Sequence, residues 1–454
     1  MQKLLPVWLF LLCLLLGGLF TMVFAWSVKD TLGGGHRFGR LGEAAVAVAS
    51  FPQMVKSSFT EIEADPDANF RVPRTSADLA EFRPLRTKSG VDVQGLMVRA
   101  DQAALSRTSG WRVLVGAFTI DGKFNHAALV LSPELEIVKI YKLTEEDIPG
   151  QKPGPPMSKF VHGFTILKDG SVIFSFDMGV SLQRFDRCGK RIWAVGGGFD
   201  HAATLDEGEK FVWTLRKDET MSEVVKVATA TGEIVRRITM DDIIAANPTI
   251  DILEIRQQDD NWGNGNPRNK REIWLGDPFH LNDVEPLPAA IADRFPGFKA
   301  GDLLLSVRSL NLVFVVDPET LEVKWWRMGA WRRQHDPDWE PTGEISVYDN
   351  RMSRDYSRIV SIVPASQKTR IVYDGRANDF YSRIRGKHQF TAAGNLLISS
   401  PQQGRVFEVE PNGQVVLEIY NTKPGSDEFN YPLSEAIFFP SDAFDFAQDF
   451  SCAN

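Results

Sequence analysis

A short pattern recurs along this chain and restricts its fold more than any other feature. Each copy begins with a histidine, passes through a polar turn and leads into β-rich runs bounded by Gly, Asp and Asn. The histidines of the clear copies are His162, His201, His280, His335 and His388, and a weaker copy runs from Trp111 through His126 to Tyr141. Periods of ~40–50 residues with about four strands each are typical of propeller blades. The repeats therefore predict an all-β fold, a six-bladed β-propeller over residues 110–454.

The geometry of a propeller brings the recurring histidines together. Radially arranged four-stranded sheets close into a ring without long exposed edges, and the first strand of each blade lines a central channel. A residue just before that strand lies at the channel mouth, and we expect the recurring histidines to occupy this position. The polar stretch 240–271 interrupts the repeats and predicts a loop over one face of the ring.

The N-terminus has a different character from the repeats. Leu4–Trp26 is an uncharged apolar run behind a single lysine, and its length approaches the ~20 residues that cross a bilayer. We expect residues 1–26 to form a transmembrane anchor, with signal-peptide cleavage before Trp26 as the alternative. In either case the propeller is expected to be exported, to the bacterial periplasm or cell surface.

Residues 27–109 are predicted to be a small lead-in segment between the anchor and the ring. A glycine run follows the anchor, and Leu41–Val55 is expected to form a short amphipathic helix near the membrane surface. The rest of the segment contains several prolines and is predicted to be irregular.

The charge restricts the kinds of partner that the chain can bind, and the cysteine content bears on its cellular compartment. The net charge is −8 and the Lys and Arg residues are scattered, so no basic stripe could follow a nucleic acid. Cys13 lies inside the apolar run, which leaves Cys188 and Cys452 as the candidate disulfide pair of the exported part. Two unpaired thiols explain the sequence equally well.

A structural role accounts for several of the histidines. Propeller repeats often use a histidine to hydrogen-bond the neighbouring turn, and we expect this role for His126, His162 and His388. His36, in the glycine-rich segment, is expected to be incidental.

The remaining histidines have neighbours that suggest chemistry. Arg308 ends the apolar strand that follows His280, and beside channel-mouth histidines it offers donors that hold an anion bidentately. His335 is the candidate nucleophile. Imidazole attacks only when it is neutral, and a partner on its other nitrogen would fix the attacking tautomer.

A metal site is the competing chemistry for a cluster of channel histidines. Zinc takes three or four N, S or O ligands in a tetrahedral array, and His201, His280 and His335 could converge in that way. A metal would not need Arg308 beside it, whereas an anionic substrate uses both kinds of side chain. We therefore expect no metal and no cofactor.

Four stretches of this sequence resemble, in order, the motifs of bacterial aryl-sulfate sulfotransferases. They are Asp200-His201, Phe279-His280-Leu281-Asn282, Leu305-Ser306-Val307-Arg308, and Gln334-His335-Asp336 through Val347-Tyr348-Asp349-Asn350. The likeness covers roughly residues 158–417. The fold that the family implies is a six-bladed propeller, which agrees with the repeat count.

The resemblance also implies an activity and a set of site residues. The implied activity moves a sulfuryl group from a phenolic sulfate ester to a phenol acceptor, without a nucleotide sulfate donor. His335 would be the transiently sulfated nucleophile. By the same resemblance, His201, His280 and Arg308 would bind the sulfuryl oxygens or handle protons.

Substrate contacts are expected from residues that flank these motifs. Asn282, Phe279 and Trp331 are the candidate substrate-binding residues, and Trp339 is a further candidate for an aromatic wall. The expected partners are the sulfate donor, the phenol acceptor, the membrane and a second copy of the chain, but not nucleic acid.

The alternative is a non-catalytic propeller that acts as a binding or scaffold module in a membrane-associated assembly, because this fold hosts many functions. A scaffold has no reason to gather His201, His280, Arg308 and His335 at one channel mouth. Convergence of these side chains therefore favours the enzyme.

Overall fold

The computed structural model describes residues 6–32, 37–63, 72–73, 79–88, 90–145, 159–177, 179–217, 222–253, 279–444 and 452. The chain divides into two compact units, Met1–Ala68 and Asn69–Asn454. His36 and residues 254–271 of the predicted loop lie outside the described residues.

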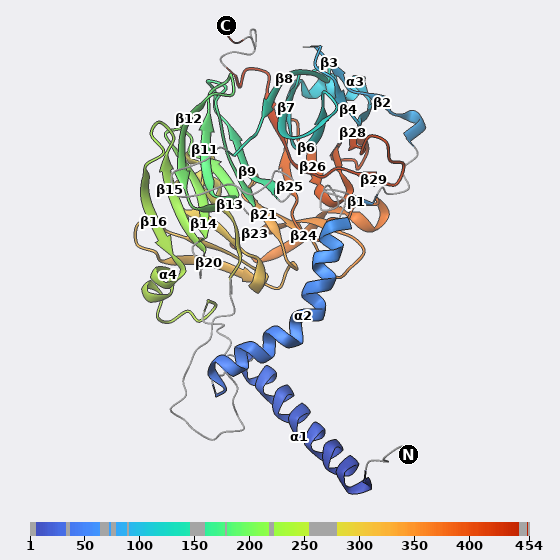
Figure 1. The fold of residues 1–454 in the computed structure, drawn as a ribbon. Helices are drawn as coiled ribbons and strands as arrows, with labels where there is room; N and C mark the ends of the chain where they lie inside the picture. The colour runs from blue at the N-terminus through green and yellow to red at the C-terminus, as the bar shows by residue number, and fades with distance from the viewer. Residues whose placement is uncertain are drawn as a thin grey trace. The chain divides into compact units, whose positions relative to one another are not determined.

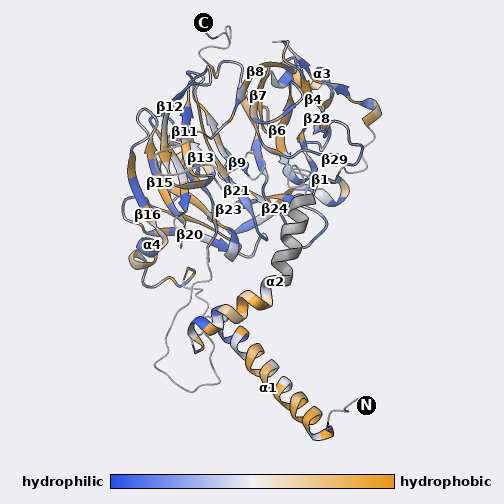
Figure 2. Cartoon of the chain, viewed as in Figure 1, coloured by the Kyte–Doolittle hydropathy of each residue, from blue (hydrophilic) through white to orange (hydrophobic). Residues whose placement is uncertain are grey.

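The first unit consists of two helices, α1 (Val7–Leu32) and α2 (Gly39–Glu63). An α-helix rises about 1.5 Å per residue, so the 26 residues of α1 exceed the ~30 Å of a bilayer core. Its most apolar window has a mean hydropathy of 2.5 and is 0% buried, and Figure 2 shows hydrophobic residues along most of the helix. The apolar helix is a candidate membrane span, and a signal sequence has the same character. It extends to Leu32, past the predicted boundary at Trp26.

The second unit is a six-bladed β-propeller (Figure 1), which confirms the fold predicted from the repeats. Blades are numbered here in chain order, and the innermost strand is given first. Blade 2 contains β9 (Phe160–Ile166), β10 (Val172–Asp177), β11 (Ser181–Phe185) and β12 (Arg191–Gly196). Blade 3 contains β13 (Gly198–Leu205), β14 (Phe211–Lys217), β15 (Ser222–Ala228) and β16 (Ile234–Thr239).

The next three blades repeat the same antiparallel order. Blade 4 contains β17 (Leu281–Pro286), β18 (Leu303–Val307), β19 (Leu312–Val316) and β20 (Val323–Met328). Blade 5 contains β21 (His335–Trp339), β22 (Ile345–Asp349), β23 (Arg358–Val363) and β24 (Lys368–Asp374). Blade 6 contains β25 (Lys387–Phe390), β26 (Leu396–Ser400), β27 (Arg405–Val409) and β28 (Val415–Asn421).

Blade 1 is assembled from both ends of the propeller sequence. Its three outer strands are β6 (Gly110–Ile120), β7 (Lys123–Leu131) and β8 (Glu136–Lys142), and its innermost strand is the C-terminal β30 (Leu433–Pro440). β30 pairs antiparallel with β6, and the six innermost strands contact one another in a closed ring. The weaker first repeat therefore lacks an inner strand of its own, which explains why its pattern differs from the others.

Part of the predicted irregular lead-in belongs to the sheets. β5 (Leu96–Ala100) pairs with β28 and extends blade 6 at its outer edge, and β2 (Arg83–Pro84) pairs with β5. The shorter strands β3 (Arg86–Thr87) and β4 (Val93–Gln94) join blade 1, and β1 (Val72–Pro73) pairs with β29 (Phe429–Asn430). The lead-in thus contributes hydrogen bonds to the first and last blades.

Hydrophobic cores fill the space between neighbouring blades. One cluster lies at each junction around the ring, for example Val224, Leu305 and Phe314 between blades 3 and 4. At the junction of blades 1 and 6, the Arg112 Nη2 atom lies 2.6 Å from Glu408 Oε2, and the two side chains are 1% and 0% exposed. This buried ion pair joins the first and last blades.

Two further features bear on the predictions. Cys188, between β11 and β12, forms a disulfide with Cys452, so the paired alternative holds and Cys13 is the free cysteine. The described start of the predicted 240–271 loop forms α4 (Met240–Ala246), which begins at a capping box between Thr239 and Asp242.

Candidate active site in the central channel

Irregularities in the innermost strands coincide with the histidine motifs. The pairing register shifts at Asp200–Ala203 in β13, at Leu281–Asp283 in β17 and at His335–Pro337 in β21. A β-bulge re-aims the side chains beside it and is often found next to active sites. The sheet is therefore interrupted in three blades at the motifs that the sequence analysis identified.

The backbone at these bulges adopts a conformation that non-glycine residues rarely take. The φ angles are +70° at His201, +50° at His280 and +52° at Asp336. Such conformations cost of order 1–3 kcal/mol each and persist only where the surrounding structure holds them. Their position in three neighbouring inner strands is typical of a functional site.

One cavity of about 350 Å³ gathers the four predicted catalytic residues. Its lining includes His201, His280, Arg308 and His335, together with His162 and Arg385. The His201 ring centroid lies 5.2 Å from that of His280 and 6.3 Å from that of His335. Arg308 follows the neighbouring strand β18, and its backbone N–H donates to the His280 carbonyl over 3.1 Å. The sequence motifs thus meet in one place.

The hydrogen bonds of His335 define its tautomer. Its Nδ1 lies 2.7 Å from Asn350 Oδ1, and the Asn350 amide nitrogen donates to the carbonyls of Ser382 and Arg385 over 2.9 and 2.5 Å. Because those carbonyls can only accept, the amide oxygen of Asn350 faces the ring, and His335 Nδ1 must carry the proton. The other ring nitrogen, Nε2, therefore carries a lone pair, which accepts a hydrogen bond from the backbone N–H of Arg385 at 3.3 Å.

His335 is also held in the neutral form. Burial lowers the pKa of His335 well below its ordinary value, and the neighbouring His201, His162 and Arg308 lower it further, against the opposing hydrogen bond to Asn350. A neutral imidazole whose Nε2 carries a lone pair is the form that can attack an electrophile.

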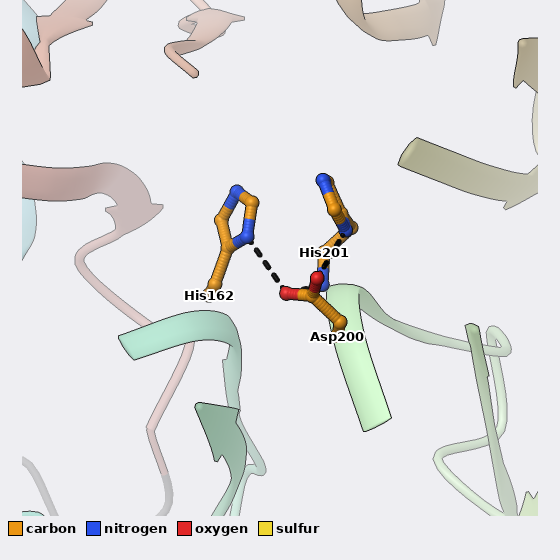
Figure 3. A group of neighbouring side chains, drawn as sticks. All are labelled: His162, Asp200 and His201. Atoms are coloured by element: carbon orange, nitrogen blue, oxygen red, sulfur yellow. Dashed lines mark hydrogen bonds and ion pairs between the residues drawn. The ribbon is translucent and has the colours of Figure 1, made fainter. Parts of the chain in front are cut away.

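Two other imidazoles of the cavity share one carboxylate. Asp200 Oδ1 lies 2.8 Å from His162 Nδ1, and Asp200 Oδ2 lies 2.8 Å from His201 Nδ1 (Figure 3). Burial alone would raise the pKa of Asp200, but the two imidazoles hold it well below its usual range. Burial lowers the pKa of His201 to about 4, although Asp200 opposes this shift.

The predicted substrate-binding residues are distributed differently. Asn282 lines a constriction of the channel next to His335, and its side-chain amide donates to the Gln334 carbonyl over 2.7 Å. Phe279 and Trp331 lie in the cores between blades 3 and 4 and between blades 4 and 5, outside the cavity lining. The aromatic residues that line the cavity are instead Phe176 and Phe199.

Several lining residues were not singled out from the sequence as site residues. His162 was predicted to be a structural fastener, and its position at the head of a repeat was the available signal. Arg385 stacks on the Phe160 ring at 4.0 Å and its Nη2 lies 2.6 Å from Asp177 Oδ2. No sequence motif marked Arg385, because it lies on the loop between blades 5 and 6.

The two other recurring histidines lie elsewhere. His126 is in β7, the third strand from the channel in blade 1, so the expected channel-mouth position is wrong for this residue. The reason is that β30 supplies the inner strand of that blade. His388 is buried in β25, with Nδ1 2.9 Å from Asp336 Oδ2 and Nε2 2.8 Å from Ser346 Oγ.

A second cavity of about 350 Å³ continues beyond the constriction and is lined by acidic groups. They are Glu285, Asp336, Asp338, Glu340 and Glu435. Lys387 is the cation among them, 2.7 Å from Asp336 Oδ1 and 3.1 Å from Asp283 Oδ2. Burial and the neighbouring carboxylates raise the pKa of Asp338 well above its ordinary value. The channel is therefore basic near His335 and acidic at this cavity.

Two groups of side chains among the described residues have the composition of a metal site. They are His162, Asp200 and His201, and Asp336, Asp338 and His388, each with ligand atoms within 4.8 Å of one another. Neither group is the set of His201, His280 and His335 that the zinc alternative named. In the first group both imidazoles make direct hydrogen-bond contacts with the carboxylate.

One protein family matches this sequence. The sequence profile of the arylsulfotransferase (ASST) family matches residues 163–422, more than half of the chain. No curated protein matches this chain. Among solved structures, a Bacteroides caccae protein of unknown function is 14% identical, with a TM-score of 0.45 over 72% of this chain and 98% of that one. Hydrazine synthase from Kuenenia stuttgartiensis is 12% identical, with a TM-score of 0.41 over 65% and 74% of the two chains.

Proposed function

We propose that this chain, which belongs to the arylsulfotransferase family, moves a sulfuryl group from a phenolic sulfate ester to a phenol through a sulfo-histidine at His335. The observation that carries the proposal is a neutral His335 whose Nε2 lone pair lies in the same cavity as Arg308 and three further imidazoles. The proposed reaction would need no nucleotide, because the sulfate ester itself would be the donor.

The charge of the cavity suits a sulfate monoester. Such an ester carries one negative charge spread over its non-bridging oxygens, and a guanidinium provides a fixed fork of donors for two of them. Arg308 and His280 are joined through their backbones, so they would present donors to the sulfuryl oxygens from one side. Donors aimed at these oxygens stabilise the charge that the transition state concentrates there.

In the first half-reaction, the His335 Nε2 lone pair forms a bond to sulfur while the bond between sulfur and the phenolic oxygen breaks. The imidazole ring gains positive character, and the Nδ1–H that donates to Asn350 Oδ1 becomes more acidic and bonds more strongly. Asn350 therefore both selects the attacking tautomer and stabilises the sulfated ring.

In the second half-reaction, the oxygen of an acceptor phenol loses its proton and attacks the sulfur, and the S–N bond breaks; this proton balances the one that the departing phenolate takes up. The electron pair of that bond returns to Nε2, which regenerates the resting imidazole. Donor and acceptor would occupy the same cavity in turn, which gives ping-pong kinetics. Phe176 and Phe199 line the cavity and would contact the aromatic rings of both.

The location proposed for this chemistry is outside the cytoplasm. The apolar helix α1 would anchor the chain in the membrane, with the propeller exported. The disulfide between Cys188 and Cys452 agrees with an oxidising compartment, where such bonds persist.

The test is release of nitrophenolate from p-nitrophenyl sulfate by the full-length protein purified in detergent, with and without an added phenol and with no nucleotide present. Release that depends on the phenol and is lost in His335→Ala, together with a sulfuryl group on His335 by peptide mass spectrometry, is the expected result. Release that His335→Ala leaves intact would overturn the mechanism. No release from any of a panel of phenolic sulfates would favour a non-catalytic binding module.

A further inference from the structure

We infer that His162, held by Asp200, is a catalytic residue: it gives a proton to the oxygen of the leaving phenol as the general acid of the first half-reaction, and takes a proton from the entering phenol as the general base of the second. The inference rests on the proposed sulfuryl transfer and adds a residue for which the repeats predicted only a structural role and which the family motifs do not include. His201 is then the neutral neighbour of His162 and not the proton carrier.

The first step of the argument is the geometry of the shared carboxylate. Asp200 accepts at Oδ1 from His162 Nδ1 and at Oδ2 from His201 Nδ1, both over 2.8 Å, and Oδ1 also accepts the backbone N–H of His201. An ionised carboxylate can only accept, so both Nδ1 atoms carry protons. Each ring therefore keeps its Nε2 atom for the cavity, and Figure 3 shows both rings standing over the one carboxylate.

The second step concerns where an additional proton would be bound. One carboxylate charge balances one imidazolium, and two rings compete for it. His201 lies between the other imidazoles, with ring centroids 4.1 Å from His162, 5.2 Å from His280 and 6.3 Å from His335. A positive charge there would face both His280 and the His335 ring that becomes cationic on sulfation. A positive charge on His162 would keep its contact with Asp200. His162 belongs to blade 2, so this charge would lie further around the ring of blades from His280 and His335 than a charge on His201.

The burial of His201 supports this assignment. The pKa of His201 is lowered to about 4, chiefly by burial, so at neutral pH this ring has no proton to give from Nε2. His162 comes from β9, the inner strand next to β13, and lines both the cavity and the constriction near His335. It is the ring in the Asp200 pair that remains to serve as acid.

The third step is the proton balance of the reaction. As the bond between sulfur and the phenolic oxygen breaks, the electron pair stays on that oxygen, which takes the Nε2 proton of His162 and leaves as a phenol. His162 is then neutral, with an Nε2 lone pair in the cavity that His335 also lines. An entering phenol gives its proton to that lone pair while its oxygen attacks sulfur, and the starting protonation state returns. No other co-reactant is needed.

The experiment compares two sulfate donors whose leaving phenolates differ in basicity, and therefore in how strongly their departure depends on protonation. Nitrophenolate is a stable anion and leaves without one, whereas phenolate from phenyl sulfate needs protonation. For His162→Gln in the full-length protein, the rate of sulfo-enzyme formation should fall ~10²–10⁴-fold more with phenyl sulfate than with p-nitrophenyl sulfate, the range typical of general acid catalysis. Asp200→Asn should show the same preference, because it removes the carboxylate that holds the imidazolium.

The matched control is His126→Gln, which replaces a buried histidine whose ring packs edge-on against Phe176 at 5.2 Å but does not line the cavity. It should change the rates with both donors by the same factor. Sulfation of His335 by p-nitrophenyl sulfate in His162→Gln shows that the variant is folded. Equal losses with the two donors in His162→Gln would overturn the inference while leaving the nucleophile intact.

Two other outcomes separate this inference from its competitors. Absence of any sulfated His335 in the unaltered protein would overturn the proposed function itself and, with it, this inference. Activity that is lost on dialysis against EDTA and restored by Zn²⁺ would also overturn it, because His162, Asp200 and His201 would then be metal ligands.

Discussion

At the scale of single residues, the candidate site depends on side chains whose protons are fixed by their partners. His335 is the first residue of β21, and Asn350 directly follows the last residue of β22. Because His335 pairs with Tyr348 in this hairpin, the hairpin itself brings the imidazole and the amide together. Asn350 is in turn oriented by backbone carbonyls from the loop before β25. The chemistry of one nitrogen atom is thus determined by three segments of chain.

The exchange Asn350→Asp tests this dependence through pH. The wild-type pKa of His335 is lowered, so the neutral nucleophile should persist below the ordinary imidazole value of ~6.5, and activity should be lost only as pH falls through the lowered value. A carboxylate next to Nδ1–H favours the imidazolium and raises the pKa of His335. The acid limb of the pH–rate profile for sulfo-enzyme formation should therefore move upward, by ~1–3 pH units.

The matched control for that exchange is Asn421→Asp. Asn421 is also fully buried and donates to a backbone carbonyl, that of Ala117, but it lies outside the cavity lining. Its exchange should lower stability without moving the acid limb. An unchanged limb in Asn350→Asp would show that Asn350 does not control the protonation of His335.

At the scale of elements, the first and last blades must recognise each other although they are far apart in sequence. β30 completes blade 1, β5 extends blade 6, and Arg112 of β6 pairs with Glu408 of β27 where the two blades meet. Asn395 also donates to Glu408, over 2.8 Å, so the carboxylate is fully enclosed by donors. A buried charge is stable only while it keeps its partner.

We therefore expect Glu408→Gln to destabilise the propeller by ~3–5 kcal/mol, because it leaves the Arg112 guanidinium buried without a counter-charge. Urea denaturation followed by tryptophan fluorescence measures the change. The double exchange Arg112→Met with Glu408→Met should cost less than the single one, since it removes both charges and keeps apolar volume. A double variant that is no more stable than Glu408→Gln would contradict this account.

At the scale of the whole molecule, ring closure is secured by more than strand pairing. Cys452 follows the closing strand β30 and is bonded to Cys188 of blade 2, so the C-terminal end is tied to the blade next to the one it completes. The bridge joins positions 264 residues apart. A covalent link over so long a loop restricts the unfolded chain strongly.

The exchange Cys188→Ser should lower the free energy of unfolding by ~2–4 kcal/mol, the range typical of native disulfides. The measurement is the denaturation midpoint with and without reductant: the unaltered protein should lose stability on reduction, and Cys188→Ser should not respond. Cys13→Ser serves as the control, because Cys13 is free and lies in α1. Alkylation of Cys188 in the folded protein without prior reduction would contradict the bridge.

Much of this architecture could be predicted from local sequence pattern. The repeats at His162, His201, His280, His335 and His388 predicted the blades because alternation and turn residues act over a few positions. The pattern also identified Arg308 and three channel histidines. The aromatic residues Phe279 and Trp331 mark the limit of this reasoning, since a large apolar side chain near a motif packs equally well into a core between blades.

The sequence by itself determined the blade fold, the apolar helix and the four side chains that meet in the cavity, because each depends on residues close together in the chain. Only the tertiary structure decided that β30 completes blade 1, that Arg385 engages His335, and that His162 shares Asp200 with His201. These pairings join segments from different blades or from opposite ends of the propeller. They arise when the ring closes, and no local pattern encodes which distant partners that closure brings into contact.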